Sequence, residues 1–322
     1  MLSDTILKNQ LKHTLDKTDF KLGKKYEGKV RDNYSFDGKR LIITTDRISA
    51  FDRVLCTIPF KGQVLNQTSA FWFDKTKKII DNHVISVPDP NAMLVKECKL
   101  IPVEMVVRGY ITGVTTTSAW YNYERGVRNY CGNVLPEELR KNQKLKRPII
   151  TPTTKELHGK HDQLISGEEA VKEELVTKEI WEEMSKAALA LYNFGNKFIA
   201  KNNLILVDTK YEFGLLDGKL ILIDEIHTPD SSRFWIKDTY EELFARREEP
   251  QKLDKEYVRQ YLANKGFIGE GEIPEIPDEV KIEAAKRYIT AYEMITGRLF
   301  EAESGDVMER IGGNLRKSGI KV

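Results

Sequence analysis

Two groups of acidic residues, on two strands that the sequence predicts to be neighbours, are the part of this chain best suited to chemistry. Each group follows four apolar residues, as in a strand buried on both faces, and Asp217-Gly218 between them is a hairpin signal. Because side chains alternate along a strand, Asp208, Lys210 and Glu212 should share one face. Carboxylates beside apolar runs are costly unless they are paired or bind a cation. Glu212 and Asp224 are therefore candidate ligands of Mg²⁺, which prefers oxygen atoms; a half-exposed hairpin with a solvated charged face is the alternative.

A second polar cluster, residues 228–233, follows the second strand and has the composition of an anion site. Pro229 ends strand pairing, and the small residues after it, including Ser232, can present hydroxyl and backbone N–H groups. Arg233 adds a planar fork that suits a phosphate or a carboxylate. Arg108, at the end of a predicted apolar strand, is a second candidate anion ligand. The alternatives are an ordinary connection with a serine cap for the cluster and a surface charge for Arg108.

A stretch of short predicted strands broken by glycine, residues 22–54, carries a cationic hairpin tip. Its backbone N–H groups and two cations suit the phosphates of a nucleoside triphosphate, although an exposed tip without a ligand is an equal alternative. The tip consists of Gly28, Lys29, Val30 and Arg31. The apolar strand predicted at 101–110 suits a hinge whose backbone meets a purine edge. With the acidic hairpin, these features favour an ATP·Mg²⁺-dependent transferase or ligase.

Length and charge exclude several classes of protein. A chain of 322 residues is long enough for two lobes around one cleft. Its 51 Lys plus Arg and 49 Asp plus Glu give a net charge of +2, and no segment has the basic density of a nucleic-acid groove. No apolar run reaches the roughly 18–20 residues of a membrane span, and no targeting signal is visible. Three scattered cysteines fit neither a disulfide framework nor a zinc site, so a cytoplasmic protein is predicted.

Periodicity predicts the elements that position these residues. Apolar residues at helical spacing predict helices at 3–16 (capped by Ser3), 66–80, 177–203, 239–248, 254–265 and 278–297. Residues 127–165 are expected to form a long polar connection, in which His161 is a solvent-exposed loop residue, and the polar tail after Glu301 is expected to be mobile. The predicted lobes are a β-rich N-terminal one at 1–108 and an α/β one at 109–322.

Seven short motifs, in order between about residue 20 and residue 298, together resemble the phosphoribosylaminoimidazole-succinocarboxamide synthase (SAICAR synthetase) family. They are Gly-Lys-Val-Arg-Asp at 28–32, Ser-Ala-Phe-Asp at 49–52, Gly-Gln-Val-Leu-Asn at 62–66, Pro-Val-Glu-Met-Val-Val-Arg-Gly at 102–109, Thr-Pro-Thr-Thr-Lys at 151–155, Val-Asp-Thr-Lys-Tyr-Glu-Phe-Gly at 207–214 and Asp-Glu-Ile-His-Thr-Pro-Asp-Ser-Ser-Arg at 224–233. Each motif alone is weak, whereas the ordered set is specific.

The resemblance implies an α+β fold of two lobes, with an antiparallel β N-terminal lobe over an α/β C-terminal lobe and ATP in the cleft. It implies that ATP and Mg²⁺ drive the joining of L-aspartate to the carboxyl group of carboxyaminoimidazole ribonucleotide (CAIR), through an acyl phosphate. The products would be SAICAR, ADP and phosphate, in purine biosynthesis. Two other classes compete with this ligase: an ATP·Mg²⁺-dependent kinase and a non-catalytic nucleotide-binding protein. The sequence contains no His-Arg-Asp catalytic loop and no Asp-Phe-Gly, which disfavours a protein kinase.

The resemblance also implies roles for individual residues. On the nucleotide side the matched residues are Gly28, Lys29, Val30, Arg31, Lys99, Ile101, Glu212 and Asp224, the last two also binding Mg²⁺. On the substrate side they are Arg108, Ser118, Ser232 and Arg233 for the phosphate and ribose of CAIR, Ser49, Asp52 and Asn66 for its imidazole and for aspartate, and Lys155 and Asp162. Lys210 would stabilise the transferring phosphoryl group, and Asp208 would be the base for the aspartate ammonium or a positioning group.

This chain departs from the family pattern in two places. The segment between Gly113 and Ser118 is longer than expected, so Thr116 or Thr117 could replace Ser118. The stretches 127–165 and 250–275 are those of a longer form of the family, so the oligomeric state cannot be transferred.

Overall fold

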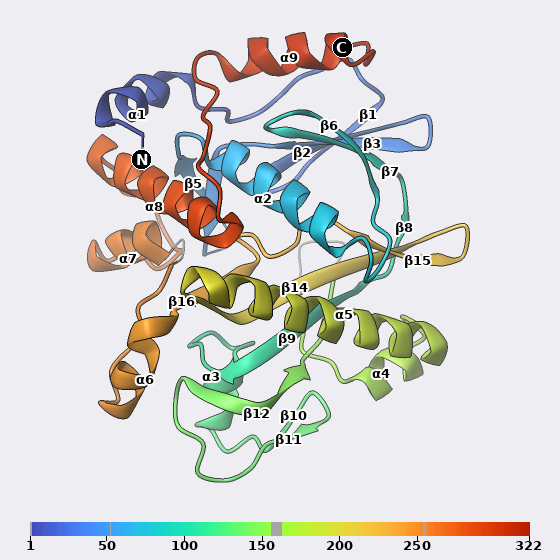
Figure 1. Ribbon diagram of the computed structural model, residues 1–322, viewed down its shortest axis with the longest axis vertical. Helices are drawn as coiled ribbons and strands as arrows, with labels where there is room; N and C mark the ends of the chain where they lie inside the picture. Colours follow the sequence, from blue (N-terminus) through green and yellow to red (C-terminus); the bar gives the residue numbers. More distant parts are fainter. Residues whose placement is uncertain (1, 52, 156–162, 254–255) are drawn as a thin grey trace.

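The computed structural model describes residues 2–51, 53–155, 163–253 and 256–322. Its upper half in Figure 1 contains an antiparallel five-stranded sheet with the strand order β1-β2-β3-β7-β6. These strands are β1 (Lys24–Glu27), β2 (Arg31–Phe36), β3 (Lys39–Thr44), β7 (Ala92–Lys96) and β6 (Val84–Asp89). A separate hairpin follows β3 and consists of β4 (Arg47–Ala50) and β5 (Arg53–Thr57).

The second sheet has seven strands, and all its pairings are antiparallel. Its main path is β12 (Gln143–Ile150), β9 (Val103–Ile111), β14 (Leu204–Leu216) and β15 (Lys219–Ile223). Three further strands pair with this path, namely β8 (Lys99–Leu100), β13 (Thr153–Thr154) and β16 (Ser232–Ile236). A two-stranded ribbon, β10 (Asn129–Tyr130) and β11 (Asn133–Val134), lies beside it. The predicted α+β fold with an antiparallel N-terminal lobe is confirmed.

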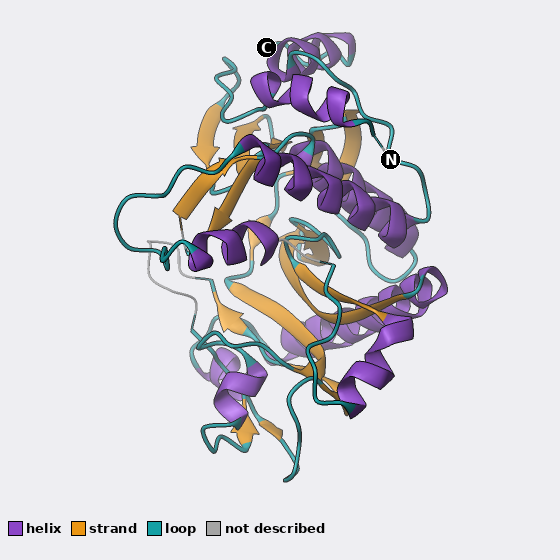
Figure 2. Cartoon of the chain, turned by 90° about the vertical axis from the view of Figure 1, so that its left-hand side faces the viewer, coloured by secondary structure: helices purple, strands orange, loops and turns teal. Residues whose placement is uncertain are grey.

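Helices cover both sheets, as Figures 1 and 2 show. They are α1 (Asp4–Gln10), α2 (Lys61–Thr76), α3 (Ala119–Tyr123), α4 (Gly167–Lys172), α5 (Lys178–Ile199), α6 (Lys237–Ala245), α7 (Glu256–Asn264), α8 (Asp278–Thr296) and α9 (Val307–Lys317), with 3₁₀ turns at Leu11–His13 and Ala200–Asn202. The long helix α5 packs along β14 and buries Met184, Ala188 and Leu191, which recur at helical spacing. In the described ranges, no helix has the length and apolar character to cross a membrane.

The acidic hairpin forms as the sequence predicts. Asp217 and Gly218 both have positive φ angles, 52° and 78°, which a two-residue turn between twisted strands requires. The turn sets the register of β14 against β15, so Glu212 lies opposite Ile223. Because β15 ends at Ile223, Asp224 is the first residue beyond the strand, where it is free to leave the sheet plane.

Two expectations, one about a central segment and one about the C-terminal tail, were wrong. Residues 127–165 contain β10 to β13 rather than a plain connection, because Leu145 and Ile149 alternate with lysines and bury one face of β12 against β9. The tail after Glu301 is not a mobile segment, since α9 buries apolar residues at helical spacing against the five-stranded sheet. These residues are Val307, Ile311 and Leu315.

One helix begins earlier than its sequence indicates. The helix expected at 66–80 starts at Lys61, and its second residue, Gly62, donates its N–H to Asp46 Oδ1 at 2.8 Å. A cap from a remote carboxylate has no local sequence signal. The other predicted helices correspond to α1, α5, α6, α7 and α8, with Ser3 and Thr177 as caps of α1 and α5.

Candidate active site

The site consists of two clusters of charged side chains on one face of β14. The first cluster, here called the acid end, is built around Lys210 and Glu212. Lys210 Nζ is 2.5 Å from Glu104 Oε1 and 3.0 Å from Glu212 Oε1. Lys155, just after β13, contacts the other oxygen of Glu212. The Glu212 side chain is 4% exposed, whereas Lys155 and Lys210 are 33% and 31% exposed. The carboxylate is therefore enclosed, while each ammonium group keeps a side from which a ligand can reach it.

Burial and neighbouring charge set the pKa values at this end. Burial alone would raise the pKa of Glu212, but Lys210 and Lys155 hold it below its usual range. Burial works against the charged form of Lys210, yet Glu212 and Glu104 raise its pKa well above the ordinary value. The pKa of Asp224 is raised, first by burial and then by repulsion from Glu212 and Glu225, against the pull of Arg31. Asp224 thus lies where more positive charge would stabilise it.

The hairpin tip of the N-terminal sheet contacts this acid end. Arg31 Nη1 is 2.9 Å from Asp224 Oδ1, and Arg31 Nη2 is 2.8 Å from Glu225 Oε1. The tip itself is a tight turn, in which Gly28 N donates to the carbonyl oxygen of Arg31 at 2.8 Å. These two ion pairs join the five-stranded sheet to the loop after β15, so the site lies where the two sheets meet.

The arginine end lies four residues earlier on the same face of β14. Asp208 Oδ2 is 3.3 Å from Arg108 Nη1, and Asp208 Oδ1 is 3.5 Å from Arg233 Nε. Arg108 also donates to Thr151 Oγ1 at 2.8 Å and to the carbonyl oxygen of Thr117 at 2.9 Å. Arg233 has fewer partners and its side chain is 35% exposed, so its guanidinium can receive an anion.

The predicted serines lie at this end. A Cβ built on Gly113 would be 2.4 Å from Ser118 Oγ and 2.7 Å from Arg233 Nη1, so both side chains border the same backbone position. Of the three candidates in this segment, Thr116 is exposed, Thr117 is half-buried, and Ser118 is buried at the N-cap of α3. Ser232 Oγ donates to Thr209 Oγ1 at 2.8 Å.

The remaining predicted residues are more dispersed. Lys99 is exposed on β8 opposite Leu215, and the N–H of Ile101 donates to Phe213 at 3.0 Å, so both lie beyond Glu212 along β14. Ser49 is half-buried on β4. Asn66 is buried on α2, and its Nδ2 donates to the carbonyl oxygen of Pro90 at 3.0 Å. The structure does not bring Asn66 into the β14 clusters, and Asp52, Asp162 and His161 lie outside the described residues.

Four charged residues of this region were missed as site residues. Glu104 shares one face of β9 with Arg108 by strand alternation, which is a signal that could have found it. Glu225 is adjacent to Asp224 but gave no separate signal. Lys61 and Asp230 form a 2.8 Å ion pair in which the lysine side chain is fully buried, and no sequence pattern joins α2 to that loop.

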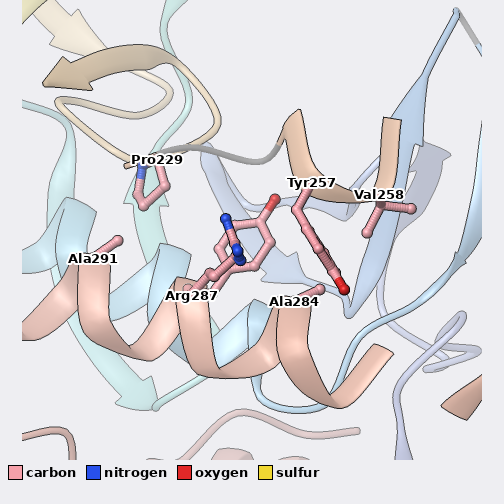
Figure 3. A pocket seen from close by; sticks show the side chains of 7 residues that line it. Pro229, Tyr257, Val258, Ala284, Arg287 and Ala291 are labelled. Carbon is pink, nitrogen blue, oxygen red and sulfur yellow. The ribbon is translucent and has the colours of Figure 1, made fainter. Parts of the chain in front are cut away.

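The described residues of this site offer few protein ligands for a metal ion. No group of three or more metal-binding side chains occurs among the residues with described positions, and Glu212 and Asp224 provide two carboxylates. Mg²⁺ commonly completes its coordination with water and phosphate oxygens, so two carboxylates at a nucleotide site fit its chemistry. A small pocket lies between α7, α8 and Pro229 (Figure 3). Tyr288, another of its lining residues, donates its hydroxyl to Asp230 Oδ1 at 2.7 Å.

Comparisons with known proteins identify the family. The SAICAR synthetase family model matches residues 24–273. The chain belongs to the SAICAR synthetase family. A phosphoribosylaminoimidazole-succinocarboxamide synthase of Legionella pneumophila (strain Paris) is 50% identical over 307 residues, which cover 94% of this chain and 98% of that protein.

Solved SAICAR synthases have the same fold. The SAICAR synthase of Saccharomyces cerevisiae complexed with SAICAR has a TM-score of 0.78 and 30% identity, and the match covers 90% of this chain and 100% of that one. A type-2 SAICAR synthetase in complex with ADP has a TM-score of 0.64 and 27% identity, over 87% of this chain and 100% of that one.

Membership confirms the function that the sequence predicts. This SAICAR synthetase family member is an enzyme of purine biosynthesis that ligates CAIR and aspartate with ATP. The kinase and binding-protein alternatives are not favoured.

Proposed function

We propose that this ligase activates the CAIR carboxyl group as an acyl phosphate at the face of β14 that carries Asp208, Lys210 and Glu212, between its acid end and its arginine end. A carboxylate is a poor electrophile because oxide is a poor leaving group, and phosphorylation by ATP replaces oxide with phosphate. The amine of aspartate then attacks the acyl carbon and phosphate departs. The observation that supports this site is the order Asp208, Lys210, Glu212 on one face, with an anion-binding group on one side of Lys210 and acids on the other.

The nucleotide belongs at the acid end in this proposal. Glu212 and Asp224 would hold Mg²⁺, which when bound neutralises phosphate oxygens. Arg31 and Lys29 would turn to the phosphates, with Gly28 and Val30 supplying the backbone of the tip. Lys99 and Ile101 would border the adenine. The Arg31–Asp224 pair supports this, because a guanidinium that already faces the carboxylate is placed to exchange it for a phosphate.

The CAIR phosphate belongs at the arginine end. Arg233 and Arg108 would bind it with Ser118 and Ser232, and Lys210 would stabilise the transferring phosphoryl group. Asp208 already has both oxygens facing arginines, so the geometry favours a positioning role over that of a base. The aspartate side remains the set predicted from the sequence.

That set consists of Ser49, Asp52 and Asn66, and Lys155 and Asp162 are further predicted substrate residues. Because Lys155 contacts Glu212, its ammonium group would also lie beside the carboxylates proposed to hold Mg²⁺ at the nucleotide. The lobe boundary after Arg108 and a cytoplasmic location stay predictions; residue 108 itself lies within β9.

ADP release by the purified protein tests the proposal, with Mg²⁺, ATP, CAIR and L-aspartate present and each omitted in turn. We expect succinocarboxamide product only in the complete mixture. ADP formed with CAIR but without aspartate would also support an acyl phosphate. Absence of turnover with CAIR, despite ATP binding, would contradict the assignment.

A further inference from the structure

The reverse face of β14 carries a buried polar contact directly behind the acid end. Tyr211 lies between Lys210 and Glu212, so strand alternation directs its side chain away from them. Tyr211 is 0% exposed, and its hydroxyl is 2.6 Å from Nε2 of His227, which is also 0% exposed. This hydrogen bond links the strand to the middle of the loop that carries Asp224.

That loop adopts a backbone conformation that needs support. Asp224 and His227 have φ angles of 64° and 49°, in the left-handed region that side-chain-bearing residues rarely occupy. Such conformations persist only where the surrounding contacts over-determine them. Within the loop, Thr228 donates its N–H to Ser231 Oγ at 3.2 Å. The loop is also tied to the edge of β14 that pairs with β16, where Lys210 N donates to Ser231 O at 3.2 Å.

The scaffold is shaped around the His227 ring. A Cβ on Gly195 of α5 would be 2.4 Å from Cε1 of that ring, so only glycine fits there. The indole of Trp72 meets the ring edge-on with centroids 4.7 Å apart. Burial lowers the pKa of His227 to about 3, so the imidazole is neutral at physiological pH. Among the described side chains, none hydrogen-bonds Nδ1, which makes the Tyr211 hydroxyl the polar contact that fixes the ring.

We propose that Tyr211 and His227 are positioning residues for the ligase reaction, whose hydrogen bond holds the loop after β15 so that Asp224 faces Glu212. They touch no reactant, because both are enclosed behind the strand. The inference rests on the proposed role of Asp224 at the nucleotide, and it predicts that a change in the core alters nucleotide binding at the other face of β14.

The test compares two buried tyrosines that each lose one hydroxyl. Tyr211→Phe removes the His227 contact. Tyr240→Phe removes a 2.9 Å bond to the carbonyl oxygen of Asn142, where Tyr240 packs against Tyr110 and Trp235 on the face of the second sheet opposite to that of Tyr211, far along the strands from Asp224. We expect similar falls in melting temperature, but only Tyr211→Phe should weaken Mg²⁺·ADP binding by calorimetry and lower kcat, each about tenfold.

A second pair of variants tests the coupling. His227→Gln keeps a group that can hydrogen-bond the tyrosine, so it should bind Mg²⁺·ADP within about threefold of wild type, whereas His227→Leu should lose about tenfold. In the Tyr211→Phe background, His227→Leu should add less than about twofold, since the bond is already absent. If His227→Leu does not fold, the tyrosine comparison decides alone.

Nucleotide binding by Tyr211→Phe within about threefold of Tyr240→Phe would overturn the positioning role. Asp224→Asn separates this failure from failure of the proposed function. Unchanged Mg²⁺·ADP binding in Asp224→Asn would remove the nucleotide role itself. If Asp224→Asn weakens Mg²⁺·ADP binding but Tyr211→Phe leaves it unchanged, only the positioning role is overturned.

Discussion

The two ends of one face of β14 carry opposite excesses of charge. At the acid end, four described carboxylates face three cations: Glu104, Glu212, Asp224 and Glu225 against Arg31, Lys155 and Lys210. At the arginine end, one carboxylate, Asp208, lies between two guanidinium groups, Arg108 and Arg233. The first end suits a cation with its phosphates, and the second suits a phosphate alone.

The difference shows how one strand can bind two reactants that require protein groups of opposite charge. Positions four residues apart on a strand are about 13 Å apart, several times the 2.5 to 3.5 Å between paired atoms within each end, so the Coulomb interaction between the ends is weaker than the pairings inside them. Each end can therefore keep its own sign. Lys210 lies between them and, among the described residues, forms its ion pairs with Glu104 and Glu212, so its exposed side is available to a group passing from one end to the other.

Lys210→Met should have the largest effect on catalysis. It removes the cation between the two ends, and we expect kcat to fall about a thousandfold, near 4 kcal/mol of transition-state stabilisation. Steady-state ADP release at saturating substrates measures it. A variant that retains more than about a tenth of wild-type kcat would show that the two ends do not communicate through Lys210.

Arg310→Met sharpens the comparison with a closed ionic cluster away from β14. Arg310 binds both oxygens of Asp89, at 3.1 and 3.2 Å, under α9, and the Asp89 side chain is 0% exposed. Loss of the arginine should cost about 3 kcal/mol of unfolding free energy by urea denaturation, because a buried carboxylate loses its partner. The kcat of the folded enzyme should stay within about twofold, and a larger fall would extend the site to α9.

Asp224→Asn breaks the acid end alone. Removing one carboxylate leaves three carboxylates and three cations at the acid end, so the excess negative charge there is lost. We expect about a hundredfold loss of rate and a higher Mg²⁺ requirement. Titration of ADP release with Mg²⁺ gives both quantities. Turnover like that of the wild type would exclude Asp224 as a metal ligand.

Arg233→Ala breaks the arginine end and should have the smallest effect. The KM for CAIR should rise about tenfold, the value of one exposed charge-assisted contact, while the affinity for ATP stays nearly unchanged. Binding of ATP and initial rates against CAIR, measured on the same preparation, distinguish the ends. A fall in ATP affinity instead would mean that the two phosphates have been assigned to the wrong ends.

Much of the site could be predicted because its formation depends on patterns among residues that are close together in the sequence. Apolar runs, an Asp-Gly turn and strand alternation located the acidic hairpin and the shared face of Lys210 and Glu212. Strand β12 and helix α9 were missed although both have periodic apolar residues. In β12 the apolar residues alternate with lysines, and α9 follows a polar stretch, so neither element was recognised. Such a pattern identifies a strand or a helix only when one of its faces is known to be buried against a neighbouring element.

By itself, the sequence determined which side chains share a face, because the two-residue period of a strand is a property of its covalent geometry. The same alternation puts Tyr211 on the reverse face from Lys210 and Glu212. The partners were decided only by the tertiary structure: Arg31 meets Asp224 across 193 residues and Lys61 meets Asp230 across 169. Such pairs depend on how two sheets and their helices pack, and packing sums many contacts that no local pattern records.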